Sequence, residues 1–221
     1  MIYMADTADV SVLKNLYEFF PLQGVTTNPT IIKRSGTKLS EAVENILKVI
    51  GQGMIHMQVI SEMADDMVKE AKAYKSYFDL GDNFYVKIPV TRQGYKAIRI
   101  LSDAGINVTA TAVFTQQQAL VASKSGASFV APYVSRLDNI SSHGIDVVKD
   151  IVKNMNDYKL PTKVLAASFK TVDQIYRVCM CDVHSVTVSP DLLEKLIKHP
   201  MTDIAVKTFK EDSEGLYDIP F

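Results

Sequence analysis

Eight short runs of β-branched and aromatic residues alternate along this chain with segments whose apolar residues recur at helical spacing. This alternation limits the possible folds more than any other feature of the sequence. Strands and helices that alternate with short connections are typical of a parallel sheet with helices on its outside. The predicted strands lie at residues 2–5, 24–27, 54–60, 84–90, 107–111, 128–131, 163–167 and 185–188.

Eight such units fit a closed (β/α)8 barrel, and 221 residues are enough for a compact one. The alternative is an open, doubly wound sheet, which normally has a glycine-rich turn after its first strand to hold a nucleotide. The loop after the first predicted strand is Asp6-Thr7-Ala8-Asp9 and contains no glycine, so we favour the barrel. We therefore predict an α/β fold with a single domain, a (β/α)8 TIM barrel over residues 1–221, in which residues 201–221 form an extra C-terminal helix and tail.

The composition is that of an ordinary soluble protein, with 47% hydrophobic residues and a net charge of -1. A near-neutral chain without a basic stripe argues against binding to nucleic acid. No apolar run approaches the length of a membrane span, and the N-terminus lacks a signal-peptide pattern. Cys179 and Cys181 are separated by one residue, a poor spacing for a disulfide, and we interpret them as reduced thiols in a cytoplasmic protein.

One lysine interrupts the fourth predicted strand, Phe84-Tyr85-Val86-Lys87-Ile88-Pro89-Val90. Lysine is almost never fully buried unless it has a partner or a task. A lysine amine in a medium of low dielectric constant loses its charge readily, and it can then form a Schiff base with a carbonyl substrate. The alternative is a lysine whose stem packs while its ammonium group extends to water.

Further polar side chains stand at the carboxyl ends of the predicted strands, the face where the catalytic residues of barrels gather. The rest of the barrel interior is expected to be Val, Ile or Leu. Each polar residue has an ordinary alternative: Asp6 could N-cap the first helix, Tyr133 could be a core aromatic, and Arg136 could form a surface ion pair. Together with Lys87 they indicate one site, because a core would not place so many polar groups in one layer. They are Asp6, Thr26, Thr27, Asn28, Gln58, Thr111, Tyr133, Arg136 and Ser168.

These residue types favour the chemistry of an imine-forming aldolase. A neutral Lys87 amine would attack a ketone, and the protonated imine would be the electron sink that lets the adjacent carbon–carbon bond break. Asp6 is the carboxylate placed to exchange protons or to bind substrate hydroxyls. The residues suited to holding a water for proton transfer are Gln58, Thr111 and Tyr133.

A phosphate group suits the remaining part of this mouth, where Arg136 and Ser168 follow the sixth and seventh strands. Lys170 follows the same mouth but begins a helix, and we interpret it as peripheral. The four histidines are scattered, with no pair spaced i, i+4, so we predict no metal site and treat a metal-dependent aldolase as a weaker alternative.

Several of these residues lie in segments that resemble the small transaldolase family, most closely its fructose-6-phosphate aldolase members. The resemblance runs along nearly the whole chain. Its most specific segments are Gly24-Val25-Thr26-Thr27-Asn28-Pro29 and Val86-Lys87-Ile88-Pro89. The other matching segments are Ala5-Asp6-Thr7, Thr111-Ala112-Val113-Phe114, Ala131-Pro132-Tyr133-Val134-Ser135-Arg136 and Val164-Leu165-Ala166-Ala167-Ser168-Phe169-Lys170.

This resemblance implies a class I aldolase without metal or cofactor. Such an enzyme cleaves fructose 6-phosphate reversibly to dihydroxyacetone and glyceraldehyde 3-phosphate through a Schiff base, here on Lys87. The further roles that the resemblance implies are acid/base catalysis for Asp6, contact with the donor's hydroxyls for Asn28, holding the catalytic water for Thr111, and phosphate binding for Arg136 and Ser168.

Two positions separate the subgroups of this family. Transaldolases usually carry Glu at the position of Gln58 and Phe at that of Tyr133, whereas the aldolases carry the Gln and Tyr found here. Phe114 departs from the Tyr of some related aldolases. The alternative function is therefore a transaldolase, which transfers a dihydroxyacetone unit between sugar phosphates, and a further alternative is a barrel that binds sugar phosphates without catalysis.

Small members of the family assemble into five-fold rings and decamers, with the C-terminal helix clasping a neighbour. The resemblance therefore implies a homo-oligomer, a pentamer or decamer, whose contacts involve residues 201–221. The amphipathic segment from Thr202 to Glu211 is consistent with this expectation.

Overall fold

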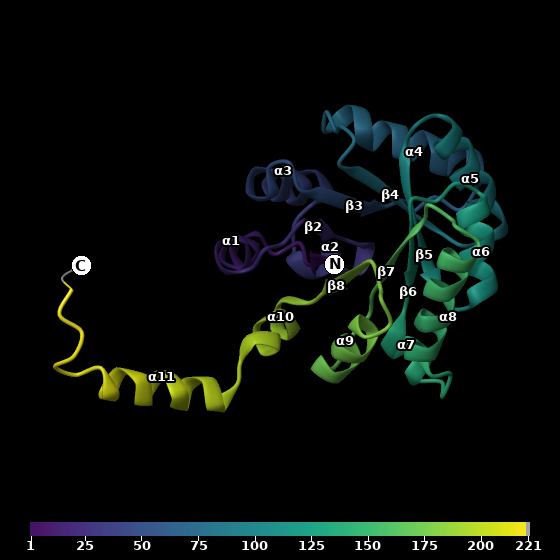
Figure 1. The fold of residues 1–221 in the computed structure, drawn as a ribbon. Helices are drawn as coiled ribbons and strands as arrows, with labels where there is room; N and C mark the ends of the chain where they lie inside the picture. The colour runs from purple at the N-terminus through teal and green to yellow at the C-terminus, as the bar shows by residue number, and fades with distance from the viewer. Residues whose placement is uncertain (220–221) are drawn as a thin grey trace.

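Parallel strands close into a barrel surrounded by helices in the computed structural model, which describes residues 1–219 (Figure 1). Strands that follow one another in the sequence are neighbours in the barrel, and the last strand pairs with the first. The predicted (β/α)8 TIM barrel is confirmed, and the open doubly wound sheet is wrong. The strands are β1 (Ile2–Asp6), β2 (Gly24–Thr26), β3 (Met54–Gln58), β4 (Phe84–Pro89), β5 (Asn107–Val113), β6 (Phe129–Pro132), β7 (Lys163–Ala166) and β8 (Ser185–Val188).

Helices follow every strand, and the extra C-terminal helix is present. Two of them, α2 and α7, are too short for helical periodicity to predict as separate elements. The helices are α1 (Val10–Phe19), α2 (Pro29–Ser35), α3 (Leu39–Ile50), α4 (Ala64–Tyr77), α5 (Arg92–Asp103), α6 (Gln116–Lys124), α7 (Val134–Asp138), α8 (Gly144–Asp157), α9 (Val172–Cys179), α10 (Pro190–Ile197) and α11 (Pro200–Asp212).

Strand β3 is shorter than the sequence predicts, because it ends at Gln58 rather than at residue 60. The Glu70 carboxylate of α4 accepts hydrogen bonds from the backbone N–H groups of Ile60 and Ser61, at 3.0 and 2.9 Å. Those N–H groups are thus satisfied by a helix rather than by a neighbouring strand. The chain therefore leaves the sheet at this point.

The two faces of the strands pack differently. The face toward the helices is aliphatic and belongs to one continuous core, for example through Val25, Ile55 and Val86. The barrel axis holds a separate cluster of bulkier and more varied side chains, so the prediction of a Val, Ile and Leu interior is wrong. This cluster consists of Met4, Phe129 and Leu165, with Ile2, Met54 and Tyr85 packed against it.

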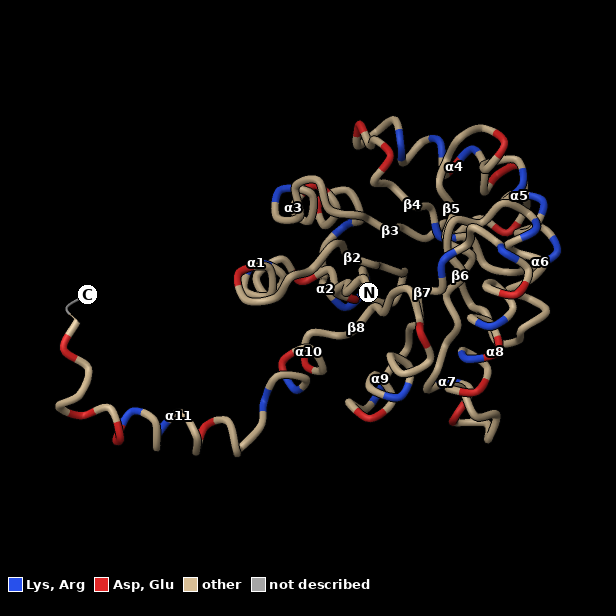
Figure 2. Tube along the Cα trace, in the orientation of Figure 1, with Lys and Arg blue, Asp and Glu red and all other residues tan. Residues whose placement is uncertain are grey.

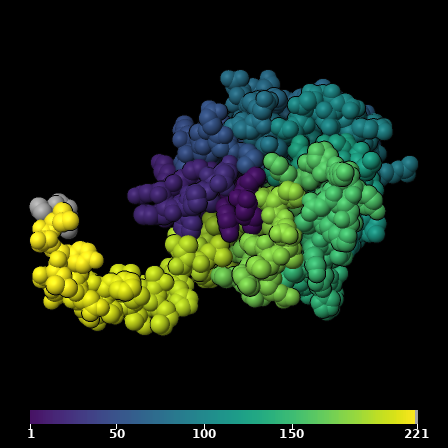
Figure 3. All heavy atoms as spheres, in the orientation of Figure 1, coloured from purple at the N-terminus to yellow at the C-terminus, as the bar shows by residue number. Residues whose placement is uncertain are grey.

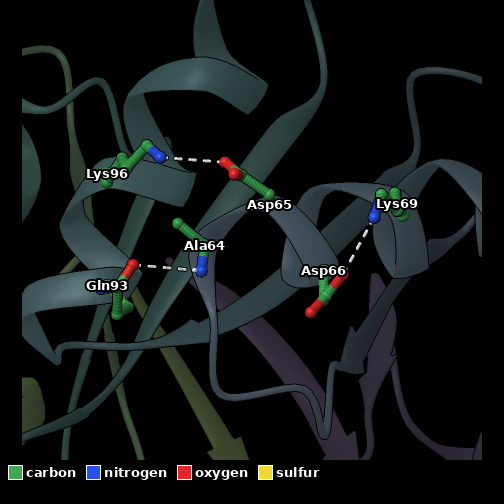
Figure 4. Close-up of polar contacts among 6 residues, drawn as sticks. All are labelled: Ala64, Asp65, Asp66, Lys69, Gln93 and Lys96. Carbon is green, nitrogen blue, oxygen red and sulfur yellow. Dashed lines mark hydrogen bonds and ion pairs between the residues drawn. The ribbon is translucent and has the colours of Figure 1, made fainter.

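Contacts between α4 and α5 show how the outer helices support one another (Figure 4). Met63 precedes α4 and offers no side-chain cap, but the Gln93 side chain of α5 accepts a hydrogen bond from the Ala64 N–H at 3.3 Å. Lys96 of α5 also pairs with Asp65 at 2.9 Å. A free backbone N–H group at the start of α4 is therefore capped by a side chain of α5.

Helix α11 extends away from the barrel (Figures 1 and 3). None of its residues is buried, and its apolar side chains Val206 and Phe209 are 61% and 69% exposed. Charged residues of both signs are interspersed along the helices (Figure 2). Within residues 1–219, no helix combines the length and the apolar character that crossing a membrane requires.

Candidate active site

The Lys87 side chain lies inside the barrel near the carboxyl ends of the strands. Lys87 is only 5% exposed, and its Nζ donates a hydrogen bond to the Thr27 carbonyl at 2.8 Å. The alternative of a lysine extending to bulk water is therefore wrong. Nevertheless, Lys87 lines a cavity of about 380 Å³ that opens at this mouth, so a ligand in the cavity can reach it.

Asp6, at the end of β1, forms the carboxylate wall of the same cavity. The Thr26 hydroxyl donates to Asp6 Oδ1 at 2.6 Å and lies 2.6 Å from the Thr187 hydroxyl of β8. Because the single hydroxyl proton of Thr26 is donated to Asp6, the Thr187 hydroxyl is the donor to Thr26. Asp6 does not cap α1, because Asp9 accepts the Ser11 N–H at 3.0 Å instead.

Thr111 and Tyr133 form a second polar pair, with their hydroxyl oxygens 2.9 Å apart. Thr111 is fully buried. The Tyr133 ring forms a T-shaped contact with Phe114, and the Arg136 guanidinium lies 4.6 Å from the centroid of the Tyr133 ring. The register of β5 against β6 shifts after Ala110, and Ala112 has a left-handed backbone with φ of 57°. This bulge sets the direction of the strand end that carries Thr111.

Arg136, on α7, and Ser168, two residues after the end of β7, line the same cavity. The two segments are tied together by the Ser135 N–H, which donates to the Ser168 carbonyl at 2.8 Å. Ser168 has a φ of 64°, a conformation that turns the chain sharply at the strand end. Lys170, expected to be peripheral, also lines the cavity and adds a second cation to this side.

Of three further predicted residues, only Asn28 lines the cavity. Thr27 faces away from the cavity, since its hydroxyl donates to the His56 carbonyl at 3.2 Å, and it offers Lys87 only its own carbonyl. Asn28 lines the cavity while its Oδ1 caps α2 by accepting the Ile31 N–H at 3.0 Å, which leaves its amide N–H groups for a ligand. Gln58 stands opposite Lys87 in the register of β3 and β4, but it lines two adjoining surface hollows rather than the cavity itself.

The cavity also contains residues that were not predicted from the sequence. Thr187 and Ser189, at and after the end of β8, line it together with Arg34 of α2. The alternation Ser185-Val186-Thr187-Val188 carried the signal for Thr187, because a hydroxyl stands at the carboxyl end of that strand as at β2 and β5. No cluster of three or more His, Cys, Asp or Glu side chains within residues 1–219 has the arrangement of a metal site.

The cavity at the mouth of the barrel therefore gathers the Lys87 amine, the Asp6 carboxylate, several hydroxyl groups and three further cations, Arg34, Arg136 and Lys170. The sequence profile of the family described as Transaldolase/Fructose-6-phosphate aldolase matches residues 3–218. A "Probable transaldolase" of Hydrogenobaculum sp. is 36% identical over 221 residues, which cover 100% of both chains. A "Probable transaldolase" of Thermoplasma volcanium is 40% identical over 210 residues, covering 94% of this chain and 92% of that protein.

The chain belongs to the transaldolase/fructose-6-phosphate aldolase family, and it is an enzyme of that family. A solved structure of a mandelate oxidase mutant has a TM-score of 0.58 over 86% of this chain and 64% of that one. At 10% identity, that likeness concerns the barrel fold alone.

Proposed function

We propose that this enzyme is a class I aldolase that cleaves fructose 6-phosphate reversibly to dihydroxyacetone and glyceraldehyde 3-phosphate through an imine on Lys87. The observation that carries the proposal is the buried Lys87 amine in a cavity that also holds Asp6 and the Tyr133 hydroxyl, 2.9 Å from Thr111. A largely buried amine that still faces a cavity is suited to nucleophilic attack on a ketone.

The reaction begins when the neutral Lys87 amine adds to the ketone carbon of the sugar. Loss of water gives the protonated imine, and a base then removes the proton of the hydroxyl β to the imine carbon. Asp6 is the carboxylate in the cavity that can act in this step. The carbon–carbon bond breaks, its electron pair moves into the imine, and glyceraldehyde 3-phosphate leaves.

The three-carbon fragment left on Lys87 is an enamine that must be protonated before hydrolysis can release dihydroxyacetone. A water held by Thr111 and Tyr133 would supply that proton, because their hydroxyls form a pair at the side of the cavity. Gln58 is the proposed third partner of this water; it stands opposite Lys87 in the register of β3 and β4 and lines the hollows beside the cavity.

The phosphate of the substrate would bind between Arg136 and Ser168, with the Lys170 ammonium beside them. A guanidinium and a hydroxyl suit phosphate oxygens, and the two cations offset its negative charge. Placing the phosphate on the β6–β7 side and the amine on β4 would stretch the sugar across the cavity. Asn28 is then the group available for the hydroxyls of the donor end.

Transaldolase is the second candidate, and the names of the curated relatives favour it. In that reaction the enamine on Lys87 waits for a second aldehyde instead of taking a proton. The Tyr133 hydroxyl argues for the aldolase, because it provides a route for protonation at the position where transaldolases resembling this chain carry phenylalanine.

Two assays on the same enzyme preparation distinguish these candidate functions. Cleavage of fructose 6-phosphate alone and transfer of its three-carbon unit to erythrose 4-phosphate are measured side by side. Release of free dihydroxyacetone at least as fast as transfer is the expected result. Transfer much faster than release would assign the enzyme as a transaldolase, and neither reaction would favour the non-catalytic barrel.

We further propose that the enzyme is a cytoplasmic homo-oligomer and that α11 lies against a second copy. Apolar helix surface that is more than half exposed normally meets a partner, and Val206 and Phe209 are adjacent on one side of α11. Part of the tail predicted to join this contact, residues 220–221, lies outside the described residues. Light scattering after gel filtration should show a lower mass for Phe209→Asp and an unchanged mass for the control Lys207→Ser. An unchanged mass for both would contradict the role of α11.

A further inference from the structure

A layer of aromatic and polar side chains fills the barrel directly below the Lys87 level. Tyr85 precedes Lys87 by two residues on β4, so both side chains point to the barrel axis. Its ring stacks on His56 of β3, with centroids 4.6 Å apart and planes at 9°. Phe129 of β6 meets both rings edge-on, at 5.4 Å from His56 and 5.2 Å from Tyr85.

His56 is held on a further side by a hydrogen bond. Its Nδ1 lies 2.8 Å from the Thr109 hydroxyl of β5, and both residues are fully buried. Its Nε2 is buried without a hydrogen-bond partner in the described part of the chain. A polar ring is thus kept in an interior position that a plain aromatic side chain could fill, although leaving a buried polar atom unpaired is costly.

Burial, and then the positive charge of Lys87, lowers the pKa of His56 well below 6.5. The ring is therefore neutral at pH 7. The titratable groups next to it are Lys87 and the Tyr85 phenol, whose own pKa is raised by burial and by the charge of Asp82. A neutral ring at this position does not repel the protonated imine that forms on a neighbouring lysine.

The Lys87 stem passes over this layer. Lys87 starts on β4, and its Nζ reaches the Thr27 carbonyl that follows β2, so the side chain crosses the position of β3. In the register of β3 against β4, Gln58 stands opposite Lys87 and His56 stands opposite Tyr85. His56 is therefore the interior residue of β3 immediately beneath the crossing stem.

We propose that His56 is a positioning residue for Lys87, and that the His56–Thr109 pair forms a rigid support that fixes where the lysine amine stands. This inference rests on the proposed imine chemistry of Lys87 and adds a residue from the layer below the cavity. The hydrogen bond to Thr109 fixes the rotation of the ring, which stacking alone leaves free within its plane. Small displacements of a reacting atom have large effects on rate, so this fixation should be visible in catalysis.

The test compares His56→Phe, Thr109→Val and the double variant with the wild-type enzyme. Phe keeps the ring and Val keeps the shape of Thr, while each removes the hydrogen bond. The rate of borohydride-dependent trapping of dihydroxyacetone on Lys87, together with kcat and KM for fructose 6-phosphate, is measured well below the unfolding midpoint of each variant. Two variants serve as controls. Thr109→Ser keeps the hydroxyl at position 109. Ser185→Ala removes a buried hydroxyl at the opposite end of the barrel, where it donates to the Val164 carbonyl at 2.8 Å.

The expected result is a fall of about tenfold in the trapping rate and in kcat for each single variant, with KM changed less than about twofold. The double variant should be no slower than the slower single variant, since both remove one contact. Thr109→Ser and Ser185→Ala should trap at the wild-type rate. A wild-type trapping rate in His56→Phe would overturn the inference. If His56→Phe does not fold, a wild-type trapping rate in Thr109→Val would overturn it. Failure of the wild-type enzyme to trap any adduct on Lys87 would instead overturn the proposed function.

Discussion

The two ends of the barrel interior are built from the same eight strands but serve different purposes. Ile2, Met54 and Phe129 pack the amino ends of their strands, and the Lys163 ammonium lies 5.9 Å from the Phe129 ring centroid. A few residues further along, the carboxyl ends present Asp6, Lys87 and Tyr133 to a cavity. The packed end resembles an ordinary core, whereas the open end holds buried polar groups. The comparison therefore predicts that activity and stability can be changed separately.

Replacing Lys87 by Met should have the largest effect on activity. Without the amine there is no covalent intermediate, so kcat/KM for cleavage should fall by roughly 10³-fold or more. The free energy of unfolding should stay the same or rise by about 1 kcal/mol, because a buried amine with one hydrogen bond gives way to an apolar side chain of similar length. Enzyme assays and urea unfolding of the same preparation check both parts. A strongly destabilised Lys87→Met would contradict the separation of the two ends.

Replacing Phe129 by Ala should have the opposite result. Phe129 is 2% exposed and packs in the barrel interior, so the cavity left behind should cost about 3–5 kcal/mol of unfolding free energy. The activity of the fraction that remains folded should change much less than in Lys87→Met. Chemical denaturation and activity at low temperature measure the two quantities. An equally large loss of activity per folded molecule would show that the packed end takes part in the chemistry.

Replacing Tyr133 by Phe sharpens the comparison within the open end. The change removes one hydroxyl of the pair with Thr111 and keeps the ring that contacts Phe114 and Arg136. Release of dihydroxyacetone should slow by about tenfold or more while transfer to an aldehyde acceptor is retained. Unfolding should change by no more than about 1.5 kcal/mol. An unchanged ratio of cleavage to transfer would mean that the Tyr133 hydroxyl has no part in protonation of the enamine by the bound water.

The pH dependence of stability tests the state of His56, which lies between the packed end and the open end of the barrel interior. The pKa of His56 is lowered in the folded protein, so the unfolded chain binds a proton there that the folded chain does not. The resulting stability is fully present above the ordinary pKa of 6.5 and is lost progressively as the pH falls below it. When the pH is lowered from 7.5 by about one to two units, the denaturation midpoint should therefore fall more in the wild type than in His56→Phe. Equal slopes would mean that His56 is not kept neutral by the fold.

Much of this architecture could be predicted from the sequence. Eight β-rich runs separated by helical segments define the barrel, and the polar residue at the end of each run indicates the open face. Asp6, Thr26, Lys87 and Tyr133 meet in one cavity as predicted, because the carboxyl ends of parallel strands must lie at the same edge.

What remained hidden depends on register. Strands that are buried on both faces carry apolar residues on each, so the sequence does not reveal that Val86 meets the helices while Tyr85 and Lys87 face the axis. The same ambiguity concealed His56 and Thr109 beneath Lys87, since they become neighbours only when β3, β4 and β5 pair. The bulge at Ala112 and the cavity position of Lys170 likewise follow from backbone geometry rather than from residue pattern.

The most direct test of the account is the site of imine formation. Wild-type enzyme is incubated with dihydroxyacetone and borohydride, digested, and analysed by mass spectrometry. The account predicts one reduced adduct, located on the peptide that contains Lys87, with loss of activity in proportion to labelling. An adduct on another lysine, or full inactivation without any modification of Lys87, would contradict it.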